Sequence, residues 1–219
     1  MQTLKYFLGI AIIMCSLIAC NSGNKRSYWE NGNVKSELNY VEDKLYGKSL
    51  WYYENGLPQM TAEYVDNILQ GEMKRWHENG QLQSVSYYKD NKLDSLFISY
   101  SIDGIKIGSE YYVDDTLHGP YYKWYENGQL MVEGQYAKGM MHGSWLFFHS
   151  DGSIAAKADF VHGSGIQKAY HDNGAVSLII HYKDNEKHGK EEFFTPAGKP
   201  SLTRIFENGM LVEEVQHEY

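Results

Sequence analysis

Nine histidines are the residues of this 219-residue chain that could most readily bind a metal ion. Six of them recur at two positions of a repeated pattern: His118, His142 and His188 at one, and His77, His149 and His171 at the other. The ligands of one ion must converge on a point, whereas equivalent positions in neighbouring units of a strand meander lie about 10 Å apart. We therefore interpret these histidines as repeat consensus. A metal site, with His149 and His171 as the nearest pair, is the weaker alternative.

The acidic residues and serines do not indicate catalysis. Asp114-Asp115 and Glu191-Glu192 are adjacent acids, which are typical of a solvated surface, and general acid–base catalysis needs two groups held across a cleft. Gly163-Ser164-Gly165 matches neither a nucleophile elbow nor a phosphate-binding loop, and Ser144 lacks a recognisable His and Asp arrangement. We predict no catalytic residue, no metal, no cofactor and no enzyme activity.

The elements that must position any site are short and repeated. Tyr125-Glu126-Asn127-Gly128-Gln129 is typical of a tight turn, and variants of it occur along almost the whole chain. The glycines of these turns stand at positions 32, 56, 80, 104, 128, 152, 174 and 198. A fixed period of 24, interrupted once by 22, indicates a repeat architecture.

Each repeat contains a second turn signal, as in Lys89-Asp90-Asn91-Lys92-Leu93. Two turns leave two segments of about seven residues, a normal strand length. We predict an all-β fold: an elongated, twisted antiparallel meander of about eight hairpins in a single sheet. We interpret the 22-residue repeat as one whose turn at Val161–Gly165 is shortened while its strands stay intact.

Two aromatic columns appear when the repeats are aligned. One column precedes the turn glycine by four residues and includes Tyr52; the other follows it by eight residues and includes Tyr64. Recurrence in every repeat favours stacked core residues over a ligand site. We expect a three-residue loop that ends in a left-handed glycine. This loop would place Tyr52 on one face with Pro58, Met60 and Tyr64.

The unit that begins at Gly119, continues through Tyr125–Gly128 and ends with Met141-His142-Gly143 resembles the bacterial 24-residue variant of the MORN repeat. The likeness covers residues 27 to about 215, with departures at Ser95, Ala197 and the 22-residue unit. The resemblance implies an array of β-hairpins. It also implies a role in protein interaction, and bacterial members are often described as antitoxin components of toxin–antitoxin systems.

The first 19 residues predict a signal peptide. Lys5 precedes an apolar segment, Tyr6–Ile18, that is too short for an ordinary transmembrane helix. Leu17-Ile18-Ala19-Cys20 resembles the lipobox of bacterial lipoproteins, which predicts lipidation of Cys20; a generic secretory signal is the alternative. We predict three parts: signal peptide 1–19, lipidated cysteine and flexible tether 20–26, and repeat domain 27–219. The protein would then be anchored in the bacterial cell envelope, facing the periplasm or the exterior.

The formal net charge of −8 argues against nucleic acid as a partner. The second face of the predicted sheet is more informative, because large apolar residues gather at its centre. The candidate partner-binding residues there are Tyr87, Phe97, Tyr111, Tyr121, Trp145 and Phe147, with Ile105, Ile107 and Met131 around them. If exposed, this patch predicts an unknown protein partner. Glycan binding along the aromatic rows is the alternative function, and closure of this face into a core is the alternative structure.

Overall fold

The structure is a computed structural model that describes residues 22–218. These residues form β-strands and no helix. The strands are β1 (Gly23–Tyr28), β2 (Val34–Val41), β3 (Lys44–Leu45), β4 (Gly47–Tyr52), β5 (Pro58–Val65), β6 (Ile68–Trp76), β7 (Leu82–Lys89), β8 (Lys92–Tyr100), β9 (Lys106–Val113), β10 (Thr116–Trp124), β11 (Leu130–Ala137), β12 (Met140–Phe148), β13 (Ile154–Val161), β14 (Ser164–Tyr170), β15 (Val176–Lys183), β16 (Glu186–Phe194), β17 (Pro200–Glu207) and β18 (Met210–Gln216). The predicted signal peptide and Cys20 lie outside the described residues.

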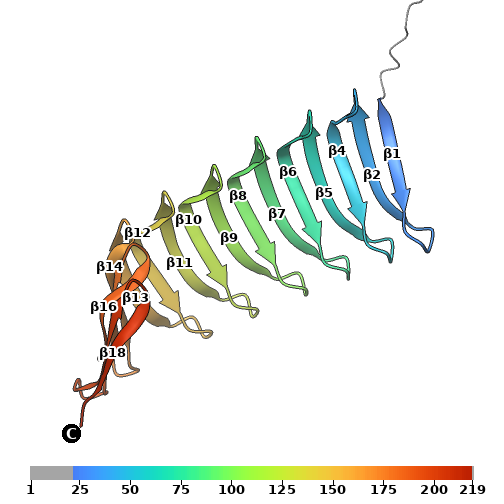
Figure 1. Cartoon of the computed structure of the whole chain (residues 1–219). Helices are drawn as coiled ribbons and strands as arrows, with labels where there is room; N and C mark the ends of the chain where they lie inside the picture. The colour runs from blue at the N-terminus through green and yellow to red at the C-terminus, as the bar shows by residue number, and fades with distance from the viewer. Residues whose placement is uncertain (1–21, 219) are drawn as a thin grey trace, which may run out of the picture.

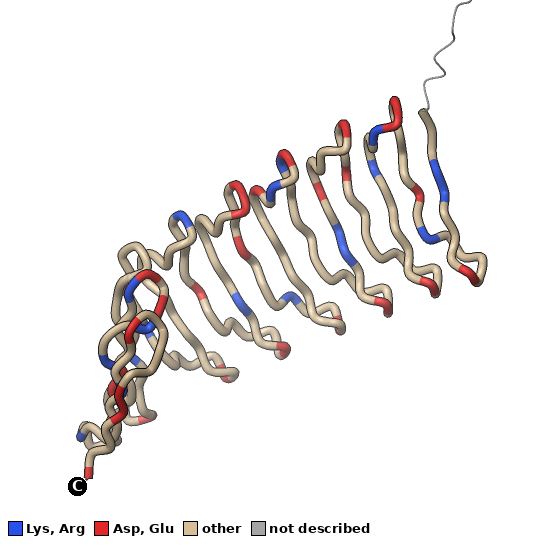
Figure 2. The backbone as a smooth tube through the Cα atoms, viewed as in Figure 1, with Lys and Arg blue, Asp and Glu red and all other residues tan. Residues whose placement is uncertain are grey.

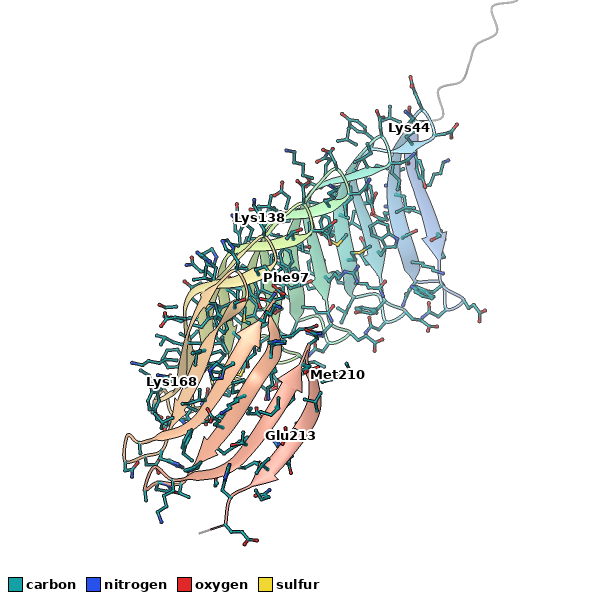
Figure 3. The ribbon with its side chains drawn as sticks, turned by 60° about the vertical axis from the view of Figure 1, so that its left-hand side comes forward. Lys44, Phe97, Lys138, Lys168, Met210 and Glu213 are labelled. Carbon is teal, nitrogen blue, oxygen red and sulfur yellow. The ribbon has the colours of Figure 1, made fainter. Side chains whose placement is uncertain are left out.

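The strands pair in chain order as one open antiparallel sheet of 18 strands (Figure 1). β3 and β4 together form the partner of β2. The sheet is elongated and twisted, so that the C-terminal strands carrying Met210 and Glu213 are turned relative to the N-terminal strands (Figure 3). The predicted all-β meander is confirmed. Seven of the eight buried apolar side chains of the described residues lie over one face of this single-layer sheet, and Val85 lies over the other.

The sheet begins earlier than the sequence indicates. The composition of residues 23–26 predicts a flexible tether, but Asn24 pairs with Asn39 and Lys25 pairs with Leu38 within β1 and β2. Backbone pairing of β1 thus fixes residues that look like a linker by composition. The repeat sheet starts at Gly23 rather than at Ser27.

The Asn-Gly turns have the predicted three-residue loop. In one of them the Gly56 N–H donates to Tyr53 O at 2.9 Å, and the Tyr53 N–H donates to Leu57 O at 2.8 Å. Gly56 has φ +84°, the left-handed conformation that glycine adopts without steric cost. The Asn55 side chain completes the turn by accepting the Leu57 N–H at 2.9 Å. The loop prediction is confirmed.

Asparagine side chains also connect successive turns. Asn55 Nδ2 donates to Glu78 O at 2.9 Å, and Asn79 Nδ2 donates to Ile102 O at 2.8 Å. The same bond recurs from Asn31, Asn127 and Asn173 to the carbonyl 23 residues ahead. Asp103 and Asp151 occupy this position in two other repeats, where a carboxylate cannot donate. Acidic residues lie at many of the turns on both sides of the array, at the two ends of the strands (Figure 2).

The two aromatic columns lie on opposite faces, so the predicted shared face is wrong. Trp51 pairs with Met60 and Tyr52 pairs with Pro58, which leaves one extra residue in β5 next to the loop. This β-bulge shifts the pairing by one residue and cancels the effect of the loop. Trp51, Met60, Ala62 and Tyr64 therefore share one face, which we call the packed face. Tyr52 lies on the other, which we call the outer face.

The 22-residue repeat lacks a strand bulge that the neighbouring hairpin has, and its turn is not shortened. This finding corrects the sequence interpretation. In the neighbouring hairpin Glu133 pairs with Leu146 and Gln135 with His142, so three residues of β12, including Gly143, lie opposite one of β11. β13 and β14 pair without any such irregularity, and β14 has seven residues where β12 has nine. The missing pair of residues therefore comes from the strand, and the turn keeps its two residues.

The packed face as candidate functional site

The six predicted partner-binding residues do not share a face. Phe97, Tyr121, Trp145 and Phe147 lie on the packed face, in cross-strand rows with Ala62 and Met60. Tyr87 and Tyr111 alternate with packed-face residues of their strands and project from the outer face, where they are 37% and 39% exposed. The six residues would share one face only if the strands lacked the bulge next to each Asn-Gly turn. That bulge shifts the alternation of side chains by one residue.

Trp145 is the centre of the core. Its ring is 5.5 Å from the Tyr121 ring, 5.1 Å from the Tyr136 ring and 6.2 Å from the Phe160 ring, between centroids, and the residue is 3% exposed. Gly134 makes this possible, because a Cβ there would lie 2.2 Å from the indole. Trp145 therefore stabilises the sheet, and its side chain is not an exposed partner contact in the isolated chain.

The histidines connect neighbouring repeats, as their consensus positions suggested. The rings of His77 and His171 hydrogen-bond to Tyr100 O and Phe194 O, at 3.2 and 2.8 Å. At the second position, His118 Nδ1 accepts the Lys138 N–H at 3.3 Å. The described residues contain no group of three or more His, Cys, Asp or Glu side chains that could hold a metal ion.

The adjacent acids also have structural partners. Asp115 Oδ1 accepts the Leu93 N–H at 2.6 Å in a turn. Glu191 is 3% exposed on the packed face and forms ion pairs with Lys187 and Arg204, whereas Glu192 lies on the outer face. Glu191 is thus neutralised by two cations, an arrangement that offsets the cost of burying its charge.

A second buried acid lies nearer the centre of the sheet. Glu110 is 9% exposed, pairs with Lys123 Nζ at 2.5 Å and accepts the Tyr112 hydroxyl at 2.6 Å. Burial, and then the hydrogen bond to Glu110, raise the pKa of Tyr112 well above its usual range. Glu110, Lys123 and Tyr112 thus form a charged, hydrogen-bonded cluster on the packed face.

The packed face is hollowed beside this cluster. A cavity of about 700 Å³ is bordered by Phe97, labelled in Figure 3, and by thirteen other residues. Those residues are Met73, Arg75, His77, Gln83, Ser84, Ser86, Tyr88, Ser99, Tyr100, Ser101, Ile102, Ile107 and Glu126. A smaller hollow of about 230 Å³ adjoins it, lined by Trp51, Tyr53, Gln59, Met60, Arg75 and Gln83. Arg75 and Gln83 line both.

Ser84 is a small residue among those that line the larger hollow. At one repeat position on the packed face, Met60, Val132, Leu178 and Leu202 are large and apolar, whereas Ser36, Ser84, Gly108 and Ala156 are small. Gly108 has no positive φ; space excludes a side chain, since its Cβ would lie 2.4 Å from Ser99 Oγ. Sequence reasoning missed Ser84, because small residues occur at this position in four of the eight repeats and do not mark a hollow by themselves.

These features define a class: an open repeat protein in which β-hairpins stack into one sheet with a packed and an outer face. A comparison with protein families then identifies the repeat. Five segments match the MORN repeat variant: residues 22–42, 45–66, 69–90, 117–138 and 164–184. A comparison with curated proteins finds no match. Within residues 22–218, no helix is long and apolar enough to cross a membrane.

Proposed function

We propose that the chain is a non-enzymatic, lipid-anchored scaffold that binds a protein partner in the bacterial cell envelope. The supporting observation is the packed face itself, which is covered by no second layer within the described residues. Half-buried aromatic side chains lie along it, among them Tyr121, Tyr136 and Phe147 around Trp145. A single-layer face of this kind gains stability when a partner covers it, and repeat proteins commonly bind along one extended face.

Cys20 supplies the anchor in this proposal, and the MORN-type repeats supply the binding surface. An antitoxin-type role, in which the partner is a toxin that the scaffold neutralises, is the specific form that the family resemblance favours. Covering an active site requires an extended rigid surface and no catalytic group on the scaffold. The proposal therefore needs only the sheet and its exposed side chains.

Crosslinking and affinity capture of the lipidated protein from its own envelope test the main proposal. We expect a protein that is captured by the wild-type chain and lost when Phe147 is replaced by Ala. The matched control is Tyr111→Ala, which removes an aromatic ring from the outer face. Equal loss in both variants, or capture of no protein, would contradict binding through the packed face.

The anchor is tested separately. A palmitate analogue should label the wild-type chain, and Cys20→Ala should abolish both the labelling and cleavage of the signal peptide. Cleavage that persists in Cys20→Ala would indicate the generic secretory signal instead.

Glycan binding is a second candidate, because one observation favours it. In the larger hollow, polar side chains lie beside aromatic ones: Ser84, Ser99 and Gln83 accompany Tyr88 and Phe97. Sugar rings stack on aromatic rings and bond to such groups. Pull-down on immobilised envelope polysaccharides should retain the chain if this function is correct. Absence of retention, together with protein capture, would leave the scaffold function alone.

A further inference from the structure

The larger hollow lies where the packed face lacks a large apolar side chain. Four of the eight repeats have such a residue, for example Met60 and Val132, at the position that Ser84 occupies in the hollow. A large apolar side chain in place of Ser84 would bury more surface and stabilise the sheet. Ser84 therefore costs stability in the isolated chain relative to such a residue. Space that is left open beside a ring such as Phe97 suits a side chain from another molecule.

The hollow contains polar groups that the described residues leave without partners. No hydrogen bond or ion pair within residues 22–218 engages the Arg75 guanidinium or the hydroxyls of Ser84 and Ser99. The nearby Lys123, in contrast, is held by Glu110 at 2.5 Å. Arg75 is the one Lys or Arg among the described residues that line the two hollows. An unpaired guanidinium is a strong partner for a carboxylate, which it binds through two parallel hydrogen bonds.

The remaining walls identify what accompanies the carboxylate. Met73, Ile107 and Phe97 present thioether, aliphatic and aromatic groups to the larger hollow, and Trp51 and Met60 do the same in the smaller one. Apolar walls of this kind match leucine-like or aromatic side chains better than a hydroxylated sugar ring. The carboxylate of Glu126 lies at the turn-side rim and disfavours a ligand that is acidic along its whole length.

We propose that the two hollows bind an extended peptide segment of a partner protein. The segment places one Asp or Glu carboxylate on Arg75 and inserts apolar side chains on either side of it, against Phe97 and against Trp51. Ser84 and Ser99 donate to its carbonyl groups. This inference rests on the proposed function and names the site and the chemistry of the partner.

Panning a phage-displayed library of random dodecapeptides on the purified full-length chain tests this site. We expect the enriched peptides to carry a single acidic residue between bulky apolar ones. A synthetic peptide of the enriched sequence should lose at least ten-fold in affinity to Arg75→Gln, because the guanidinium is lost. It should lose as much to Ser84→Met, because the longer methionine side chain would occupy space in the larger hollow.

Matched controls separate binding from folding. Lys157→Gln removes one cation from the outer face, and Val132→Met makes a similar packing change outside the two hollows. Both should leave peptide affinity unchanged. Ser84→Met should keep or raise the urea midpoint, and should it fail to fold, Arg75→Gln still decides the question.

Three results would contradict the proposed peptide site. They are enrichment of no peptide, enrichment of peptides without an acidic residue, and unchanged peptide affinity in Arg75→Gln and Ser84→Met. Binding of polygalacturonate that is lost in the same two variants would assign the hollows to a glycan instead. Capture of a native protein whose crosslinks lie outside the hollows would also overturn the site, yet it would leave the proposed scaffold function standing.

Discussion

At the scale of single residues, the asparagine of each Asn-Gly turn has two tasks. Asn79 Oδ1 accepts the Gln81 N–H at 3.0 Å within its own turn, and Asn79 Nδ2 donates to Ile102 O in the next repeat. Aspartate can perform the first task but not the second. The turn signal in the sequence therefore also specifies a link between repeats, which only the stacked structure makes visible.

This division of tasks predicts opposite effects for a reciprocal pair of substitutions. Asn79→Asp should lower the free energy of unfolding by about 1 kcal/mol, because one inter-repeat hydrogen bond is lost. Asp103→Asn should raise it by a similar amount, because it supplies a donor toward the next turn. Urea unfolding followed by tyrosine and tryptophan fluorescence measures both. Effects of the same sign would contradict this role of the inter-repeat hydrogen bond.

Buried tyrosines predict a loss of stability at alkaline pH. Burial, and then the bond to Glu110, raise the pKa of Tyr112, and burial raises the pKa of Tyr136 and Tyr182 as well. The folded chain favours the neutral phenol. The contribution of these neutral tyrosines to the free energy of unfolding is therefore fully present below the unfolded pKa of about 10. It is lost as pH rises through the folded pKa. Urea midpoints should fall between about pH 9 and pH 12.

Tyr112→Phe provides the matched variant, because it keeps the ring and removes the titrating hydroxyl. Its urea midpoint should fall less steeply over the same pH range than that of the wild-type chain. Identical slopes would mean that other groups cause the alkaline loss.

At the scale of elements, the shortened repeat changes how turns connect. Elsewhere a turn residue bonds to the turn of the preceding repeat, as when Asn91 Oδ1 accepts the Leu69 N–H at 2.8 Å. Asn185 reaches one repeat further: its Oδ1 accepts the Met141 N–H at 2.8 Å and its Nδ2 donates to Gly139 O at 2.8 Å. Its own N–H bonds to Gly163 O at 2.9 Å. Asn185 thus joins three turns where the array has lost two residues.

Asn185→Ala should therefore destabilise the chain more than Asn91→Ala. We expect a loss of about 2 kcal/mol against about 1 kcal/mol, because two side-chain hydrogen bonds are removed instead of one. Amide exchange at Met141 should accelerate only in Asn185→Ala. Equal losses in the two variants would contradict a bridging role for Asn185.

At the scale of the whole molecule, an open meander gives an elongated particle. Seventeen strand positions, with β3 and β4 counted as one, extend over about 75 Å at 4.8 Å per strand before twist is considered. Small-angle X-ray scattering of the monomeric chain should therefore give a radius of gyration above about 20 Å. A compact chain of this length would give about 17 Å. A value near the compact one would contradict the open sheet.

Most of the fold could be predicted because its signals are local and repeated. The Asn-Gly turn at Tyr53–Gly56 and the two-residue turn at Asp90–Asn91, whose φ values are 52° and 66°, are each specified by a few adjacent residues. Strand length follows from the spacing of these turns. The period of 24 thus determined the antiparallel meander without any knowledge of contacts.

The faces and the candidate site could not be predicted in the same way. One extra residue at Gln59 decides whether Tyr52 or Trp51 faces Tyr64, because side chains alternate along a strand. No local signal marks that bulge. The sequence therefore grouped Tyr87 with Trp145, which the structure separates to opposite faces.

The sequence by itself determined the repeat, the turns and the order of the strands, because each depends on residues that are neighbours in the chain. The tertiary structure decided which side chains share a face, that Trp145 is buried, and that Ser84 lies in a hollow beside Arg75. These properties depend on pairing between strands and on the volume of side chains from several repeats. They emerge only when the hairpins are stacked.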